Sequence, residues 1–147
     1  MPARILLVNG PNLNKLGERE PEIYGRETLE GIEQKCKETA TSLGLALDCW
    51  QSNVEGEIVT KIQDAGKTYQ GLLINAGAYT HTSIAIMDAL LTLTIPVIEV
   101  HLSNPARREE FRHISYVSKA AAGVIAGFGS QSYLLALTAM HELLKNQ

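Results

Sequence analysis

Short apolar runs alternate with segments of helical periodicity along this chain. The runs have the length and apolar content of buried β-strands, and they cover 5–8, 45–50, 71–75, 95–101 (entered through Pro96) and 123–126. Between them, apolar residues recur at every third or fourth position, which predicts amphipathic helices over 28–43, 57–65, 82–93 and 133–145. Thr28 is the expected N-cap of the first helix, and Gly44 and Gly66 are expected to end the first two helices.

This order of elements predicts an α/β fold. Strands that are joined through helices form right-handed βαβ units, which give a parallel sheet covered by helices on both faces. The near-continuous apolar character of the strands fits burial on both sides. We therefore expect a flavodoxin-like, doubly wound five-stranded parallel sheet with the strand order 2-1-3-4-5. At 147 residues, without an internal repeat or a linker, the chain is expected to be a single catalytic domain over 1–147.

Charge and cysteine content narrow the functional classes. Thirteen basic and sixteen acidic residues give a net charge of −3, which does not supply the basic surface expected for binding nucleic acid or a membrane. Cys36 and Cys49 are not in a CxxC arrangement and predict neither a zinc site nor a redox pair, and reduced thiols fit a cytosolic protein. The apolar run over 5–8 is too short for a signal peptide or a membrane span, so we expect a cytoplasmic location.

Polar residues follow three of the predicted strands. They are Asn9 to Asn12 after the first, Asn75 to Gly77 after the third, and Glu99 and His101 at the end of the fourth. A parallel sheet places these strand ends side by side, so residues far apart in sequence are expected to meet in one crevice. Each of them alone could be a turn residue, which is the usual role of a lone Asn-Gly. The agreement of three strand ends favours a site.

Glu99 and His101 are two residues apart on one strand. Their side chains therefore emerge on the same face, where the carboxylate can hold the imidazole in one tautomer and make it a general acid. The alternative is a histidine that only ends the strand. The following segment, Ser103 to Pro105, offers a hydroxyl and backbone amides of the kind that receive a carboxylate.

The loop after the first strand contains the largest set of candidate groups. Its sequence over 9–25, NGPNLNKLGEREPEIYG, includes Asn12, Asn14, Arg19 and Tyr24. A tyrosine base must be ionised near neutrality, although its reference pKa is about 10. Lowering that pKa by about 3 units takes roughly 4 kcal/mol, which one or two arginines in a dry site can supply. Arg19 and Arg108 are the available cations.

Other polar residues have two interpretations. The charged run over 107–113 is either a solvated turn or a source of Arg108 and Arg112 for the crevice. His81 lies where the third helix is expected to begin. Asp88 lies within an otherwise apolar stretch of that helix, which indicates a partner such as one across a subunit contact.

Three kinds of cofactor chemistry have weaker support. The segment 127–132, GFGSQS, lacks the third glycine of a dinucleotide loop and follows the last strand, so a tight turn is the better interpretation. His81, His101 and His113 could be drawn as a metal site with Glu99, but no two of them have helical ligand spacing. No lysine stands alone at an apolar strand end to form a Schiff base. We expect no metal and no cofactor.

The candidate groups together describe one reaction class. A tyrosine base, a histidine acid held by a carboxylate, amides for a developing enolate and a nest for a carboxylate fit the elimination of water from a β-hydroxy ketone acid.

Three blocks of the sequence resemble type II 3-dehydroquinate dehydratases. They are the loop over 9–25, INAGAYTHTSIAIMDAL over 74–90 and PVIEVHLSNPARREEFRHISYVS over 96–118. The resemblance covers essentially the whole chain and implies a flavodoxin-like subunit. It also implies reversible anti dehydration of 3-dehydroquinate to 3-dehydroshikimate through an enolate, a step of the shikimate pathway towards aromatic amino acids that also serves quinate breakdown. Ser132 lies where the family usually has glycine, which puts the turn into the last helix in question.

The resemblance also implies roles for individual residues. Tyr24 would remove the C2 proton, with Arg19 on a mobile lid promoting its ionisation. Asn12 would steady the enolate through a water, and His101, backed by Glu99, would protonate the departing hydroxyl. The implied substrate contacts are Asn75, His81, Asp88, Leu102, Ser103 and Arg112. Family members typically form homododecamers of trimers, in which Asp88 would reach a neighbouring subunit's site.

Two other functions compete with this interpretation. One is a metal-dependent hydrolase or lyase that uses His81, His101 and Glu99. The other is a flavodoxin-like binding or receiver module, although a receiver needs acidic residues after the first strand and this chain has Asn9 to Asn12 there.

Overall fold

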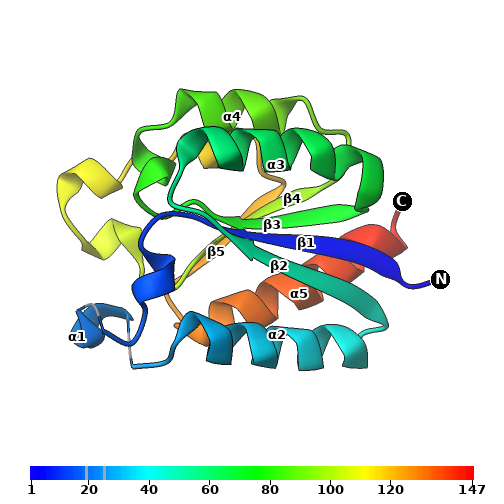
Figure 1. The fold of residues 1–147 in the computed structure, drawn as a ribbon, viewed down its shortest axis with the longest axis horizontal. Coiled ribbons are helices and arrows are strands. Elements are labelled where there is room, and N and C mark those ends of the chain that lie inside the picture. The colour runs from blue at the N-terminus through cyan, green and yellow to red at the C-terminus, as the bar shows by residue number, and fades with distance from the viewer. Residues whose placement is uncertain (19, 25) are drawn as a thin grey trace.

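The computed structural model describes residues 1–18, 20–24 and 26–147, and only the backbone of Pro21 and Tyr24. Its centre is one parallel five-stranded sheet with the order β2-β1-β3-β4-β5, which confirms the expected topology (Figure 1). The strands are β1 (Ala3–Asn9), β2 (Leu45–Gln51), β3 (Gly71–Asn75), β4 (Val97–His101) and β5 (Gly123–Ala126). All neighbouring strands pair in parallel, as expected for βαβ connections.

Helices cover both faces of the sheet. The α-helices are α1 (Pro21–Tyr24), α2 (Leu29–Ser42), α3 (Glu55–Thr68), α4 (Ile84–Leu91) and α5 (Ser130–Lys145). Short 3-10 helices lie in the connections, and they are η1 (Leu13–Lys15), η2 (Gly77–His81), η3 (Pro105–Arg107), η4 (Glu110–Arg112) and η5 (Val117–Lys119). Figure 1 shows α3 and α4 on one face of the sheet and α2 and α5 on the other.

The alternation of side chains along each strand divides the core into two layers. Ile5 and Leu7 of β1 pack in the layer beneath α2 and α5, whereas Leu6 and Val8 pack beneath α3 and α4. All four are fully buried. Burial on both faces explains why the strand reads as a continuous apolar run rather than an alternating one.

Some predicted boundaries are confirmed and others are wrong. Thr28 caps α2 by accepting a hydrogen bond from the Gly31 N–H at 3.1 Å, and Gly44 follows the helix with a φ of +75°. Gly66 does not end α3, which continues to Thr68. A Cβ at Gly66 would lie 3.3 Å from the Leu93 side chain, so this glycine allows close packing within the helix rather than a turn.

Local hydrogen bonding moves three further boundaries. The predicted strand over 95–101 begins at Val97, because Pro96 has no N–H to donate to the ladder. The predicted helix over 82–93 shortens at both ends to α4, and its start is set by Ser83, which caps it by accepting from the Ile86 N–H at 2.9 Å.

The last helix begins earlier than predicted, at Ser130. Ser132 is buried inside it and accepts a hydrogen bond from the Phe128 N–H at 3.0 Å, a bond that glycine could not make. The serine therefore stabilises the turn into α5. The most buried line of this helix runs through Tyr133, Leu137 and Met140.

Candidate active site

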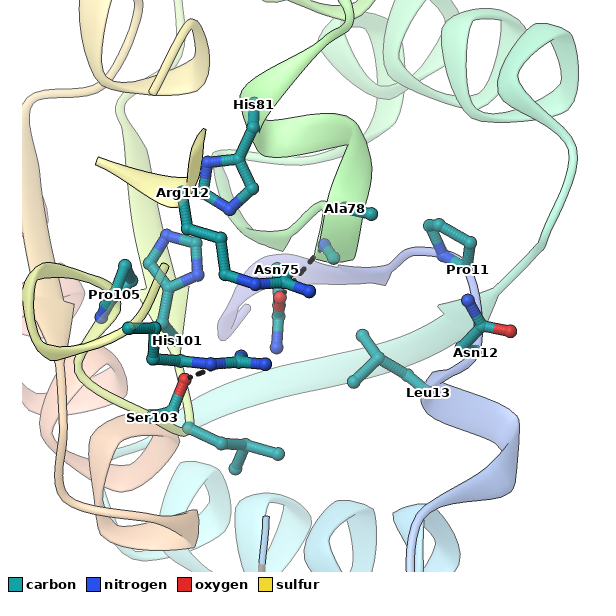
Figure 2. A pocket seen from close by; sticks show the side chains of 13 residues that line it. Pro11, Asn12, Leu13, Asn75, Ala78, His81, His101, Ser103, Pro105 and Arg112 are labelled. Carbon is teal, nitrogen blue, oxygen red and sulfur yellow. Dashed lines mark hydrogen bonds between the residues drawn. The ribbon is translucent and has the colours of Figure 1, made fainter. Parts of the chain in front are cut away.

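A pocket opens where β1, β3 and β4 end, as the convergence of polar strand ends predicted (Figure 2). It is a small hollow that is partly open to solvent. The pocket is lined by Pro11, Asn12, Leu13, Asn75, Gly77, Ala78, His81, His101, Leu102, Ser103, Pro105, Arg108 and Arg112. Figure 2 shows His81, His101 and Arg112 on one side, Asn12 and Leu13 on the other, and Asn75 between them.

Two glycines bring the loops after β1 and β3 together to form this pocket. A Cβ at Gly10 would lie 2.5 Å from the Ala76 carbonyl oxygen. Gly77 has a φ of +58°, and a Cβ there would lie 2.9 Å from the Pro11 carbonyl oxygen. Any side chain at either position would push the two loops apart.

His101 is held by Glu99, as their spacing on the strand predicted. The His101 Nε2 atom is hydrogen-bonded to the Glu99 carboxylate, and both side chains are largely buried. Because Nε2 is bound to the carboxylate, Nδ1 is the ring nitrogen that remains for a ligand. A carboxylate in this position can carry the counter-charge when the imidazole is protonated.

Two serines complete the surroundings of Glu99. Ser115 Oγ donates to Glu99 Oε2 at 2.8 Å, and Ser118 Oγ donates to Glu99 Oε1. Burial opposes ionisation of Glu99, but the hydrogen bonds from His101, Ser118 and Ser115 and the attraction of His101 outweigh it. The pKa of Glu99 therefore lies below its ordinary value, so the carboxylate is ionised near neutrality.

His81 is held by a backbone carbonyl instead. Its Nδ1 lies 2.8 Å from the Ile114 carbonyl oxygen, so Nδ1 carries the proton and donates. Burial, together with the nearby His101 and Arg112, lowers the pKa of His81, although the Ile114 carbonyl and Glu99 oppose the shift. A neutral His81 presents Nε2 as an acceptor.

Arg108 and Arg112 provide positive charge in the pocket. Their side chains are only 14% and 18% exposed, which excludes the alternative of a solvated charged turn. Glu109 Oε1 lies 3.1 Å from Arg112 Nε and 3.7 Å from Arg108 Nε, and one Arg108 nitrogen lies 3.4 Å from Ser103 Oγ. None of the described lining residues is acidic, so the pocket suits an anionic ligand.

Asn75 and Asn12 add amides to opposite parts of the pocket. Asn75 is buried at the end of β3, where its Oδ1 accepts from the Gly77 N–H at 3.1 Å and its Nδ2 donates to the Tyr133 hydroxyl at 2.9 Å. Asn12 has a left-handed backbone, with a φ of 69°, and its N–H donates to Asn53 Oδ1 at 2.9 Å. This conformation positions Asn12 on the wall formed by the first loop.

Two predicted residues cannot be placed relative to the pocket, and a third, Asp88, does not line it. Arg19 lies outside the described residues, as does the side chain of Tyr24. The helix that contains Tyr24 borders a second hollow, because Glu22 and Ile23 line it together with Ser103 and Arg108. Since Ser103 and Arg108 line both hollows, α1 lies beside the pocket. Asp88 is exposed on α4 and is not among the lining residues.

Ser115, Ser118 and Tyr133 were not predicted from the sequence. Each reaches the site through tertiary packing: the serines contact Glu99 from the connection before β5, and Tyr133 contacts Asn75 from α5. A tyrosine in an amphipathic stripe indicates a core residue, and serines in a loop indicate a turn. The only sequence signal for these three residues was that they lie in or near segments that contain other candidate residues.

The described part of the chain contains neither a cluster of metal ligands nor a membrane-spanning helix. No three His, Cys, Asp or Glu side chains are grouped there as ligands of a metal ion. No helix in those ranges has the length and apolar character needed to cross a lipid bilayer.

The chain is similar to known proteins over nearly its full length. The family model described as dehydroquinase class II matches residues 3–141. A 3-dehydroquinate dehydratase of Prochlorococcus marinus (strain MIT 9515) is 57% identical over 143 residues, which are 97% of this chain and 98% of the relative. One from Rhizobium meliloti (strain 1021) is 54% identical over 143 residues and 97% of each chain. The crystal structure of a type II dehydroquinase from Butyrivibrio crossotus DSM 2876 superposes with a TM-score of 0.93 at 46% identity, covering 95% of this chain and 97% of that one. The chain therefore belongs to the class II dehydroquinase family.

Proposed function

We propose that this hydro-lyase converts 3-dehydroquinate reversibly to 3-dehydroshikimate and water by anti elimination through an enolate. The observation that carries the proposal is the buried Glu99–His101 pair in a pocket that also contains two arginines. Dehydration of a hydroxy ketone acid requires a general acid for the departing hydroxyl and a cationic site for the carboxylate, in one pocket. We treat residues 1–147 as one catalytic domain.

His101 acts as the general acid. Protonated His101 gives its proton to the C1 hydroxyl as the C1–O bond breaks, and the hydroxyl leaves as water. Glu99 is bound to Nε2 and carries the counter-charge of the imidazolium, so the proton is given from Nδ1. In the reverse direction the same histidine removes a proton from water.

Tyr24 acts as the base. Its phenolate removes the C2 proton, and the electrons of the C–H bond move into the enolate of the C3 ketone. Arg19 on the lid lowers the pKa of the phenol, and Asn12 steadies the enolate through a water molecule. The position of α1 beside Ser103 and Arg108 supports a lid that closes over this pocket.

The remaining lining residues bind the substrate. The backbone amides of Leu102 and Ser103 and the Arg112 guanidinium hold its carboxylate, with Arg108 nearby. Asn75 and neutral His81 bind its hydroxyl groups. The low exposure of both arginines supports this assignment, because partly buried guanidinium groups bind carboxylates more strongly than exposed ones.

We further propose that subunits assemble as a dodecamer of trimers, in which Asp88 reaches a neighbouring subunit's site. Asp88 lies on an exposed face of α4 with Ile84 and Leu91, which are 53% and 57% exposed. Phe111 and Ile114 are also exposed, near Arg112. Exposed apolar side chains of this number are typical of a subunit interface.

Subunit mixing tests this assembly. Oligomers of Asp88→Asn alone and of His101→Ala alone should each be weakly active. When the two are dissociated and mixed, some sites combine the intact His101 of one variant with the intact Asp88 of the other, and these sites should recover activity. Light scattering should give the mass of twelve subunits. A monomer with full activity would contradict the proposal.

The Tyr24→Phe variant tests the proposed mechanism. It should lose nearly all turnover while it binds substrate almost as well as the unmodified enzyme, since the hydroxyl acts in the chemical step. Turnover is followed by the absorbance of the conjugated enone product, and binding by calorimetry. An equal loss of binding would make Tyr24 a contact residue rather than the base.

Two treatments separate this mechanism from other dehydration chemistry. Exhaustive chelation should leave activity unchanged, whereas lost activity that a metal restores would favour a metal site at His81, His101 and Glu99. Borohydride in the presence of substrate should not inactivate the enzyme, and inactivation would indicate a Schiff base on a lysine.

We place the enzyme in the cytoplasm, in the shikimate pathway of aromatic amino acid biosynthesis. Cys36 and Cys49 are free thiols, which supports a reducing compartment.

A further inference from the structure

A chain of buried hydrogen bonds connects the substrate pocket to α5. Asn75 Nδ2 donates to the Tyr133 hydroxyl at 2.9 Å, and that hydroxyl donates to Asn9 Oδ1 at 2.7 Å. Tyr133 and Asn9 are fully buried, and Asn75 is 4% exposed. Asn9 and Asn75 are paired at the ends of β1 and β3, so the hydroxyl bridges two strand ends beneath the pocket.

The direction of every bond in this chain follows from one backbone group. The Gly77 N–H can only donate, so the Asn75 atom that faces it, at 3.1 Å, must be the oxygen. The Asn75 nitrogen then faces Tyr133, whose hydroxyl must accept. Its single proton is left for Asn9, so the Asn9 atom at that contact must be an oxygen.

This directionality explains an otherwise unfavourable feature. Asn9 Nδ2 is buried and has no hydrogen-bond partner among the described residues. Rotating the Asn9 amide would place its nitrogen against the Tyr133 hydroxyl and leave that hydroxyl's proton to compete with the Asn75 amide. Buried polar groups are normally paired. Asn9 Nδ2 is left unpaired because the Tyr133 hydroxyl must donate its proton to the Asn9 oxygen.

We propose that Tyr133, oriented by Asn9, is a positioning residue that fixes the Asn75 amide for binding of a substrate hydroxyl. This inference rests on the substrate-binding role of Asn75 in the proposed function. With one hydrogen of Nδ2 bound to Tyr133 and one acceptor position of Oδ1 bound to Gly77, the amide presents the same donor and acceptor to every substrate molecule. Without the hydroxyl only the Gly77 N–H holds the amide, and the Nδ2 side loses its partner.

Steady-state kinetics of Tyr133→Phe test the proposal. The variant should raise KM about fivefold to tenfold, the size expected for one lost hydrogen bond, and should change kcat less than about twofold. Leu137→Val is the matched control, since Leu137 is fully buried on the same helix and does not line the pocket. It should lower the unfolding temperature with KM unchanged. Equal KM changes in both variants would overturn the proposal.

A double-mutant cycle separates this inference from the function on which it rests. Asn75→Ala should raise KM, and adding Tyr133→Phe to it should have no further effect on KM, because Tyr133 acts through Asn75. If Asn75→Ala raises KM but Tyr133→Phe does not, the positioning role alone is overturned. If Asn75→Ala leaves KM unchanged, the binding role of Asn75 and the inference fall together.

Neutron diffraction of the unmodified protein gives a result even if Tyr133→Phe does not fold. The deuteron of the Tyr133 hydroxyl should point to Asn9 Oδ1, and an Asn75 amide deuteron should point to the Tyr133 oxygen. A Tyr133 deuteron that points to Asn75 would overturn the proposal.

Discussion

Two histidines line the same pocket but have different hydrogen-bond partners. His101, at the end of β4, is bound through Nε2 to the buried carboxylate of Glu99. His81, in the turn after β3, is bound through Nδ1 to the neutral carbonyl of Ile114. At one position the carboxylate can carry the counter-charge of an imidazolium. At the other, burial and neighbouring positive charge lower the pKa of His81 and favour the neutral ring.

The difference shows how one residue type can take two roles within a single pocket. A protonated histidine with a counter-charge can release a proton to a leaving group, whereas a neutral histidine whose Nδ1–H is bound to a carbonyl offers Nε2 to accept a hydrogen bond from a hydroxyl. The partner that a strand or a turn supplies therefore decides the role. The predictions below test this division between His101 and His81.

The largest effect is expected for His101→Ala. Removing the general acid should lower kcat about 10³-fold, within the usual range for acid catalysis, with a much smaller effect on substrate binding. Nuclear magnetic resonance in deuterated water should still detect exchange of the substrate's C2 proton, because Tyr24 removes that proton. Loss of exchange together with dehydration would contradict separate acid and base residues.

Glu99→Gln should have the second largest effect. The amide has the same shape, but it carries no charge and cannot accept from His101, Ser115 and Ser118 together. We expect kcat to fall about 100-fold, since the protonated histidine loses its counter-charge. Far-ultraviolet circular dichroism provides the control for folding, and an unchanged kcat in a folded variant would show that the carboxylate is dispensable.

His81→Ala should affect binding rather than chemistry. Loss of one acceptor should raise KM about tenfold while kcat changes less than about threefold. The comparison with His101→Ala under the same conditions is direct, because both variants remove an imidazole from the same pocket. A kcat loss as large as that of His101→Ala would contradict the assigned difference.

Ser118→Ala tests the support of Glu99 and should have a smaller effect. One of the donors that stabilise the carboxylate is removed, so we expect kcat to fall about fivefold. Ser118→Thr keeps the hydroxyl and should restore most of the activity. Ser83→Ala is the matched control, since it removes the N-cap of α4 and lowers stability without a contact to Glu99. Equal kcat losses in both alanine variants would indicate a purely structural role.

The smallest effect is expected in the pH dependence of stability. Because the folded pKa of His81 is depressed, the unfolded chain binds more protons than the folded one below the unfolded pKa near 6.5. Stability should therefore fall as the pH falls from 7.5 to 5.5, and by less in His81→Ala. For a half-buried group the difference should be below about 1 kcal/mol, measured by urea unfolding. If the free energy of unfolding fell more with falling pH in His81→Ala than in the unmodified protein, the expected sign would be wrong.

Features that depend on local periodicity could be predicted from the sequence. The strands, their order and the Glu99–His101 contact follow from apolar runs, alternation with helices and a spacing of two along a strand. Gly66 was misread as a helix end because its role, close contact with Leu93, depends on a distant part of the chain.

Features that depend on tertiary packing could not be predicted. The burial of Arg112 depends on how the charged segment packs against η2, the turn after β3, so its sequence fitted a solvated turn equally well. Ser118 and Tyr133 lie far in sequence from Glu99 and Asn75, and no spacing rule connects them. Individual side chains of a site are therefore harder to predict than the sheet that positions them.

The most direct test of the whole account is the absorbance of purified protein mixed with 3-dehydroquinate, with a chelator present. We expect the conjugated enone of the product to appear, at a rate that His101→Ala lowers far more than His81→Ala does. A folded protein that produces no enone would contradict the proposed dehydration. Equal rates in the two histidine variants would contradict the division of roles between the carboxylate-bound and the carbonyl-bound histidine.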